Sequence, residues 1–312
     1  MDKIRFSAVT CGEDHILAVT LDGLVYTWGN GQQGQLGRRI IERRKINALA
    51  PSKLDLKNII SIGAGAFHSF AVNNKGDVYG WGLNTFGQLG VEPIDDLMSA
   101  PVHIPELSPD KHAEAKVVQI EAGEHFSLFL FDNGEVWGSG RCDAHQLGID
   151  EKHPAMQAIL KQREEWSKQR DTELAKELEA YQKRMAAKKA EAKADGAAVG
   201  AFDSVLSAED MPPVKGPPPT ECVFEPVHIP FPDNVRIVNI SCGARFSVAV
   251  AADGSAYSWG LGVNSELGQG DEEDIETPTL LRSKTLNTHA ALSASAGGQH
   301  SVLLAVPKPA AP

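Results

Sequence analysis

Histidines recur at one fixed position in the chain, three residues after a glycine, and an imidazole is the side chain best suited to acid–base work near neutral pH. His15, His68 and His300 hold this position in GEDH, GAFH and GGQH. Phe126 and Phe246 hold it in GEHF and GARF, so two repeats lack the imidazole. The pattern therefore predicts a position that serves packing and local hydrogen bonding.

The rest of the sequence offers no group for covalent chemistry. It contains no GxSxG, Walker loop or HExxH motif. The four cysteines are too widely spaced for a zinc pair or a CxxC redox motif, and they stand at Cys11, Cys142, Cys222 and Cys242. We therefore expect no bond-making enzyme, no catalytic residue, no cofactor, no metal ion and no small-molecule substrate.

The residue just before this His or Phe varies from repeat to repeat, whereas the glycine does not. In chain order the varied residues are Asp14, Phe67, His125, Arg245 and Gln299. Varied side chains on equivalent loops of one scaffold are typical of a recognition surface. Taken alone, Asp14 is more typical of a solvated turn carboxylate.

One loop is basic although the chain as a whole is acidic. Within GRRIIERRKINALAPSKL it carries Arg38, Arg39, Arg43, Arg44 and Lys45. A run of like charges is often only a solvated surface, but it can also bind an anionic partner or serve as a nuclear import signal. A second basic stretch, KRMAAKKAEAK, could be such a signal as well.

All of these residues lie within a sequence repeat, which predicts the elements that position them. Four units align in register, namely GEDHILAVTLDGLVYTWGNGQQGQLG, GAFHSFAVNNKGDVYGWGLNTFGQLG, GEHFSLFLFDNGEVWGSGRCDAHQLG and GARFSVAVAADGSAYSWGLGVNSELG. A fifth unit, GGQHSVLLAV, stops halfway. With the segments between them, the units hold four short runs of β-forming residues each, joined by turns such as Asp-Gly and Asn-Gly. The sequence therefore predicts an all-β fold, a β-propeller.

A tryptophan recurs at one position of the repeat, as Trp28, Trp81 and Trp259. Its large side chain is expected to fill the space between adjacent blades. In the third unit Ser139 takes this position, and Trp137 lies two residues earlier. The third blade is therefore expected to pack differently.

One stretch interrupts the repeat between the third and fourth units. Residues 151–194 are rich in Ala, Glu, Lys, Gln and Arg and predict a solvated helix, and the Gly- and Pro-rich residues that follow predict disorder. We therefore expect three parts: propeller blades over 1–150, a helical and then disordered insertion over 151–221, and propeller blades over 222–312.

Composition limits where the protein could act. The chain of 312 residues has a formal net charge of -11, with 42% hydrophobic and 23% charged residues, which is typical of a globular protein and opposes non-specific binding to nucleic acid. No apolar run approaches the roughly 20 residues of a membrane span, and the N-terminus lacks the apolar region of a signal peptide. We expect a cytosolic or nuclear protein without a membrane partner.

The motifs VYxWG, GQLG, PVxIP and xxGxxHSxAV recur in fixed order and cover everything except the insertion. In this combination the chain resembles the regulator of chromosome condensation family, whose fold is a seven-bladed propeller. It is most similar to the exchange-factor branch, whose partner is the small GTPase Ran. Against that family about five blades are represented, with three complete units, a first blade without its opening strand and a last blade without its closing strands. The chain is thus expected to be the C-terminal portion of a longer protein.

The resemblance also implies functional residues. The principal exchange residues of the family match Asp14 and His125, and Arg38 and His300 are secondary matches. The family's long loop near the histone contact corresponds to the basic loop, which gives chromatin-binding candidates at Arg39, Arg43, Arg44 and Lys45. The nucleus is then the expected location, with the cytoplasm as a second one.

Two functions remain open on this basis. The first is guanine-nucleotide exchange on Ran, in association with chromatin and nucleosomes. The alternative is a non-catalytic propeller scaffold that binds a protein or chromatin partner. A carbohydrate-binding propeller is disfavoured, because its repeats would be expected to carry matching sites.

Overall fold

The computed structural model describes residues 4–40, 48–92, 96–194 and 211–308. The chain divides into two compact units, which are Met1–Ala155 with Thr220–Pro312 and, separately, Met156–Pro219. The first unit contains the β-sheets, and the second contains most of the long helix α1 (Pro154–Ala194).

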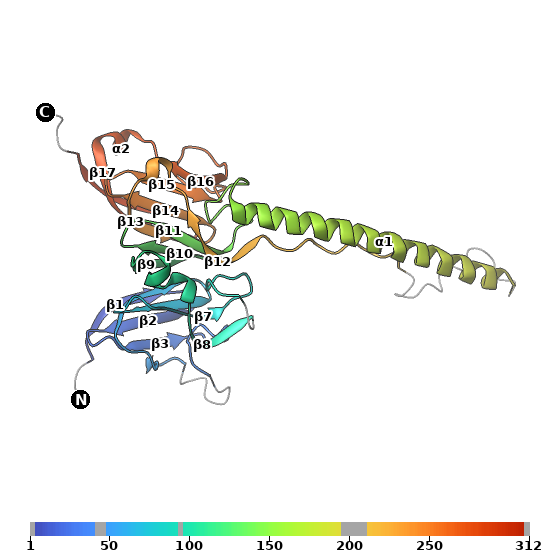
Figure 1. Ribbon diagram of the computed structural model, residues 1–312, viewed down its shortest axis with the longest axis horizontal. Coiled ribbons are helices and arrows are strands. Elements are labelled where there is room, and N and C mark those ends of the chain that lie inside the picture. The colour runs from blue at the N-terminus through green and yellow to red at the C-terminus, as the bar shows by residue number, and fades with distance from the viewer. Residues whose placement is uncertain (1–3, 41–47, 93–95, 195–210, 309–312) are drawn as a thin grey trace. The chain divides into compact units, whose positions relative to one another are not determined.

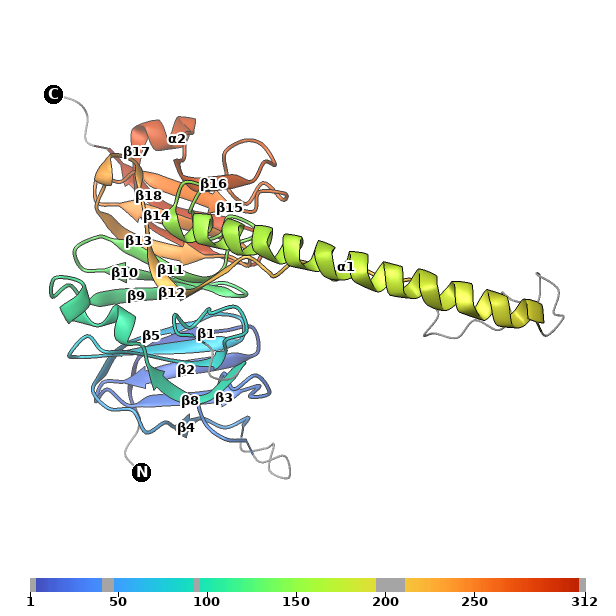
Figure 2. The same ribbon diagram turned by 45° about the vertical axis from the view of Figure 1, so that its right-hand side comes forward.

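The described part of the first unit folds into four four-stranded antiparallel sheets and one two-stranded sheet, which follow one another in chain order (Figures 1 and 2). The first two sheets consist of β1 (Phe6–Cys11), β2 (His15–Thr20), β3 (Val25–Gly29) and β4 (Ser52–Lys53), and of β5 (Ile59–Ala64), β6 (His68–Asn73), β7 (Val78–Leu83) and β8 (Leu97–His103). The next two consist of β9 (Val117–Ala122), β10 (Phe126–Phe131), β11 (Val136–Arg141) and β12 (Cys222–Ile229), and of β13 (Ile237–Cys242), β14 (Phe246–Ala251), β15 (Ala256–Gly260) and β16 (Ile275–Leu280). The short helix α2 (Lys284–Thr288) precedes the last pair, β17 (His289–Ala296) and β18 (Ser301–Pro307).

The sheets are arranged as propeller blades. Within each sheet, strands that follow one another in the chain are also neighbours in space. The first strands of successive sheets contact one another in order, β1 with β5, β5 with β9, β9 with β13 and β13 with β17. Apolar side chains such as Phe70, Ile104 and Phe129 fill the space between adjacent sheets.

The first sheet has its opening strand, so the expectation of a first blade without one is wrong. Residue pairs such as Val9 with Ala18 and Thr10 with Leu17 join β1 to β2. In this strand the large apolar side chains Phe6 and Val9 are both exposed, so β1 does not show the alternation of buried and exposed residues by which a strand is recognised in a sequence. A strand at the edge of a sheet needs no alternating buried residues to form its backbone pairs.

The insertion follows the third repeat unit in the chain and, in the strand order, separates β11 from β12 of the third sheet. Strand β12 follows the insertion and pairs with β11, with His228 opposite Trp137 and Cys222 opposite Arg141. The fourth strand of the third blade is therefore supplied from beyond the insertion.

Adjacent blades are joined by hydrogen bonds to a backbone carbonyl in the loop after the third strand. The Gln35 oxygen accepts a hydrogen bond from Trp81 Nε1 at 2.9 Å and another from Ser69 Oγ at 2.9 Å. The same pair of bonds recurs at the Gln146 oxygen. The Gln of GQLG therefore supplies the acceptor, and the Trp of VYxWG in the next blade supplies the donor, of one hydrogen bond between blades.

The third sheet is fastened differently, as the sequence predicts. Ser127 Oγ donates to the Gln88 backbone oxygen at 2.7 Å, but Ser139 stands where other blades have the tryptophan. Among the described residues, the buried Ser139 hydroxyl has no hydrogen-bond partner. Trp137 packs instead against His112, with the ring centres 4.6 Å apart.

In the second unit, the segment after α1 is held against the helix. Lys215 Nζ lies 2.6 Å from Asp171 Oδ1 and 5.7 Å from the centre of the Trp166 ring. Arg170 Nη2 donates to the Val214 carbonyl at 3.0 Å. This part of the segment predicted to be disordered therefore makes specific contacts, while residues 195–210 lie outside the described residues. No helix within the described ranges has the length and apolar character needed to cross a membrane.

Candidate functional site

Equivalent loops join the first and second strands of the successive sheets, and their glycines determine the loop shape. The Gly65 N–H donates to the His68 carbonyl, and the Gly123 N–H to the Phe126 carbonyl, both at 3.0 Å. A Cβ at Gly65 would lie 2.3 Å from His68 Cε1, and one at Gly123 would lie 2.1 Å from Phe126 Cε1. The ring of the third residue thus folds back over the glycine, which explains the constant spacing.

Backbone hydrogen bonds also link each loop to the next. Ala66 N donates to the Gly123 oxygen at 3.0 Å, and Glu124 N donates to the Ala244 oxygen at 3.1 Å. This chain of bonds orders the loops around one face of the propeller. The varied residues therefore follow one another on that face as Asp14, Phe67, His125, Arg245 and Gln299.

The repeat histidines His15 and His68 take part in the hydrogen bonds that join adjacent blades. His15 Nε2 lies 2.8 Å from Ser69 Oγ, whose hydroxyl donates to the Gln35 backbone oxygen. Because that proton is already used, His15 must be the donor to Ser69 and carries its hydrogen on Nε2. Burial lowers the pKa of His15 to about 4 and that of His68 to about 3, so both are neutral at physiological pH.

The four residues predicted to bind a GTPase lie at separate places. Asp14 is exposed on the first loop and His125 is on the third, with the loop of Phe67 between them. His300 is exposed in the loop between β17 and β18, and Arg38 lies on a different loop, after β3. The structure therefore does not gather these four side chains into one cluster.

His125 has an aromatic and charged environment that the sequence does not reveal. Its ring lies 5.9 Å from the Phe67 ring at an angle of 30°, and 4.9 Å from the Phe86 ring at 49°. The Arg141 guanidinium lies over the Phe86 ring, 5.4 Å from its centre. Asp143 fixes that guanidinium by accepting from Nε at 2.8 Å and from Nη2 at 2.6 Å.

Charges of both signs surround the His125 imidazole. Burial lowers the pKa of His125, the Glu124 carboxylate opposes this, and Arg141 and Arg245 add to the lowering. Glu124 Oε1 lies 3.7 Å from His125 Nε2, and Glu124 Oε2 accepts from Arg245 Nε at 3.3 Å. The imidazole is therefore neutral near pH 7 and is able to form hydrogen bonds without carrying a charge.

Phe86 occupies a second varied position of the repeat, two residues before the GQLG glutamine. Its N–H donates to Gln88 Oε1 at 2.9 Å, and the same loop bond holds the equivalent residues Gln33, Ala144 and Asn264. A residue that varies while its flanking motif stays constant is the sequence signal that could have identified Phe86.

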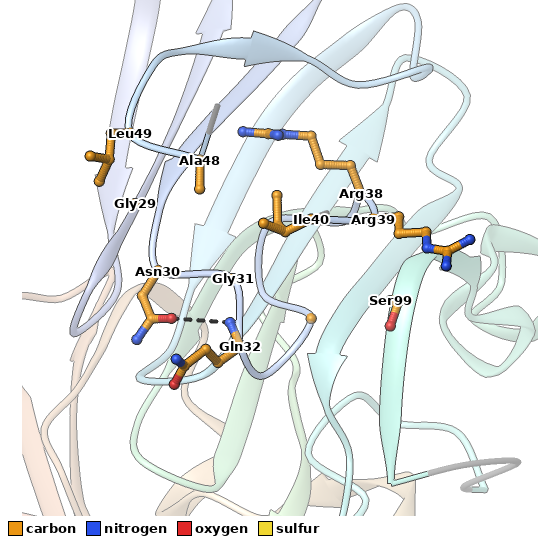
Figure 3. A pocket seen from close by; sticks show the side chains of 11 residues that line it. Gly29, Asn30, Gly31, Gln32, Arg38, Arg39, Ile40, Ala48, Leu49 and Ser99 are labelled. Carbon is orange, nitrogen blue, oxygen red and sulfur yellow. Dashed lines mark hydrogen bonds between the residues drawn. The ribbon is translucent and has the colours of Figure 1, made fainter. Parts of the chain in front are cut away.

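The basic loop begins beside a hollow of about 670 Å³ in the first blade (Figure 3). Arg38 and Arg39 both line it, but their guanidinium groups point in different directions. Arg38 Nη2 donates to the Thr27 carbonyl at 3.3 Å and burial lowers its pKa, whereas Arg39 is exposed. At one edge of the hollow, Gly31 stands where the second blade has the buried Asn84.

Two of the cysteine thiols are poorly suited to nucleophilic attack. Burial raises the pKa of the Cys142 thiol to about 12 and that of Cys242 well above its usual value, which disfavours a nucleophilic thiolate. Within the described ranges, no three His, Cys, Asp or Glu side chains are placed to hold a metal ion. Of the chromatin-binding candidates, Arg43, Arg44 and Lys45 lie outside the described residues.

The fold and these loops define a class: a β-propeller protein whose repeated loops carry varied side chains on one face. The chain belongs to the RCC1-like domain family, because the sequence model of that family matches residues 1–303. The family predicted from the repeats is thereby confirmed.

Several known proteins are similar to the chain. Protein pim1 of Schizosaccharomyces pombe is 39% identical over 297 residues, which cover 95% of this chain and 44% of pim1. The guanine nucleotide exchange factor SRM1 of Saccharomyces cerevisiae is 31% identical over 313 residues, covering 96% of this chain and 50% of SRM1. The crystal structure of Prp20p from Saccharomyces cerevisiae, described with its binding properties to Gsp1p and histones, has a TM-score of 0.72 at 28% identity and covers 99% of this chain and 58% of Prp20p. The chain spans about half the length of the curated relatives it matches.

Proposed function

We propose that this chain acts in guanine-nucleotide exchange on the small GTPase Ran, in the nucleus and in association with chromatin. The observation that carries the proposal is the row of varied side chains on one face of an otherwise repetitive RCC1-like propeller. The 31% identity to an exchange factor supports exchange as the activity. Prp20p, which is described as binding Gsp1p and histones, supports a GTPase and histones as partners.

Exchange of this kind needs no bond-making group. The factor binds the nucleotide-free GTPase more tightly than the loaded one, and linkage then requires that it weaken nucleotide affinity by the same factor. The face offers an exposed carboxylate at Asp14 and a neutral imidazole at His125 for such contacts. Both groups can form hydrogen bonds that are stronger in the nucleotide-free complex than in the loaded one.

We assign the main GTPase contacts to Asp14 and His125 and the secondary ones to Arg38 and His300. Asp14 and His300 are exposed and His125 is half-buried at the surface, so each can reach a partner. Arg38 is already bonded to a backbone carbonyl, so its contribution is the smallest of the four.

The chromatin contact is assigned to the basic loop. Its exposed Arg39 begins a stretch that continues with Arg43, Arg44 and Lys45. In an acidic chain, such a local concentration of positive charge favours an acidic partner surface.

The test is the release of fluorescent GDP from Ran. The parental chain should accelerate release, and Asp14→Ala and His125→Ala should each slow it about tenfold to a hundredfold, because loss of one charge-assisted contact costs about 1.5–3 kcal/mol. Asn74→Ala, an exposed residue in a hairpin turn on the opposite side of the sheets, is the control and should change nothing. If the parental chain leaves GDP release unchanged, exchange is wrong and the non-catalytic scaffold replaces it.

A further inference from the structure

We infer that Phe86 is a positioning residue for His125, which it holds together with Phe67 so that the Nε2 edge of the imidazole is offered to a partner. The inference rests on the proposed function, since it specifies how that recognition face presents one of its hydrogen-bonding groups. The partner atom it requires is an oxygen acceptor, either a backbone carbonyl or a carboxylate.

Two rings from different loops restrict the imidazole. Phe67 lies on the loop between β5 and β6, and Phe86 lies on the loop after β7. Their ring centres are 5.9 Å and 4.9 Å from that of His125. Only 17% of the His125 side chain is exposed. Rotation of the imidazole would have to displace one of the two phenyl rings, so its orientation is fixed.

The two nitrogens of the imidazole are in different environments. His125 Nδ1 is buried and, within the described part of the chain, has no hydrogen-bond partner. His125 Nε2 lies 3.7 Å from Glu124 Oε1. The nearby carboxylate favours the tautomer with the hydrogen on Nε2, because an N–H directed at a negative oxygen is stabilised. The surface edge of the ring is therefore a neutral hydrogen-bond donor.

Phe86 is itself held in place. The Arg141 guanidinium covers its ring at 5.4 Å, and Asp143 binds that guanidinium through two hydrogen bonds. A cation over an aromatic face is attracted by the ring quadrupole. The residues that restrict His125, directly or through Phe86, thus come from three loops of two neighbouring blades.

The sequence of the repeats points to the same pairing. At the Phe86 position the other units have Gln33, Ala144 and Asn264, and none of these is aromatic. At the His125 position the other units have Asp14, Phe67, Arg245 and Gln299, and none of these has an imidazole. Phe86 and His125, each found in only one repeat at its position, therefore contact each other across two blades.

The test compares Phe86→Ala with Phe86→Tyr by NMR titration of His125 and by GDP release from Ran. Burial lowers the pKa of His125, and Glu124, Arg141, Asp143 and Arg245 are the charged groups that face it. Phe86→Ala opens the ring to water, so the pKa of His125 should rise toward its ordinary value. The freed imidazole should also lower kcat/KM for exchange about fivefold to tenfold, mainly through kcat, because the proposed His125 contact is stronger in the nucleotide-free complex than in the loaded one.

Phe86→Tyr keeps the ring and should preserve both the titration and kcat/KM. Gln33→Ala is the matched control, since it removes a side chain from the equivalent loop of the first blade. If Phe86→Ala lowers the melting temperature markedly, Phe86→Leu replaces it, because leucine keeps bulk without an aromatic face.

The inference is overturned if the titration of His125 does not move in Phe86→Ala. It is equally overturned if the titration moves while kcat/KM stays at the parental value, because the imidazole would then be held in place without contributing to exchange. If the parental chain shows no exchange at all, the proposed function fails, and the titration alone decides whether Phe86 positions His125.

Discussion

Trp81 and Gln35 lie in neighbouring sheets, and a hydrogen bond of 2.9 Å from the indole Nε1 to the Gln35 backbone oxygen joins them. The same oxygen accepts from Ser69, and the Trp81 side chain is fully buried. One carbonyl therefore fixes the distance between two blades. This contact explains why the Trp and GQLG motifs recur together along the chain.

Trp81→Phe should lower the free energy of unfolding by about 1–3 kcal/mol, because it removes a buried hydrogen bond and leaves part of the indole space empty. Chemical denaturation measures the change. Trp28→Phe is the control, since Trp28 is only half-buried and should cost less. Equal losses in the two variants would contradict the assignment of Trp81 to the fastening between blades.

Gly65→Ala should destabilise the protein by about 2 kcal/mol, which is typical of forced overpacking. The added Cβ would lie 2.3 Å from His68 Cε1 and 2.7 Å from the Gly123 backbone oxygen, and the second atom has little freedom to move. Thermal unfolding measures the effect. Gly216→Ala meets nothing within 4 Å and should be neutral, so a comparable loss there would point to a general intolerance of alanine.

The sequence predicts those parts of the fold that depend on local spacing. The constant spacing from the glycine to the following His or Phe reflects a ring that folds over its own turn, as at Gly65 and His68, and it is found in every repeat. The burial of Trp81 and Trp259 is predicted in the same way, whereas Trp28, at the same position of the first repeat, is only half-buried.

The features that the sequence does not predict depend on contacts between distant segments. Strand β12 pairs with β11 although the insertion separates the two strands in the chain, so proximity in the sequence does not reveal this pairing. The contact between Phe86 and His125 joins loops of two blades, and neither residue belongs to a motif. Such pairings are decided by the geometry of the assembled propeller.

Replacing Arg43, Arg44 and Lys45 by Glu should weaken nucleosome binding and reduce its salt dependence, because fewer counterions are released when fewer cations contact an anionic surface. Fluorescence anisotropy with labelled nucleosomes at several salt concentrations measures both. Replacing Lys161, Arg163 and Lys168 of α1 by Glu changes the net charge equally and is the control. Equal effects from the two triple variants would mean that net charge, and not this loop, determines binding.

His15 gives the fold a defined sensitivity to acid. The pKa of His15 falls from 6.5 to about 4 on folding, because burial disfavours the charged imidazole. Between these two pH values the unfolded chain binds a proton that the folded chain does not, so stability is greatest above pH 6.5 and falls as the pH drops. A shift of this size corresponds to about 3 kcal/mol, lost progressively as the pH falls through that range.

His15→Phe should remove this part of the pH dependence, because Phe126 already shows that a phenyl ring fits over the loop glycine. Denaturation of both proteins at pH values from 7 to 4 measures the difference, and other titrating groups cancel because the two chains share them. The variant should lose the bond to Ser69 and be less stable at pH 7, yet its stability should decline less on acidification. If the two stability curves remain parallel, His15 takes up its proton equally well in the folded and unfolded chain, and its burial does not oppose protonation.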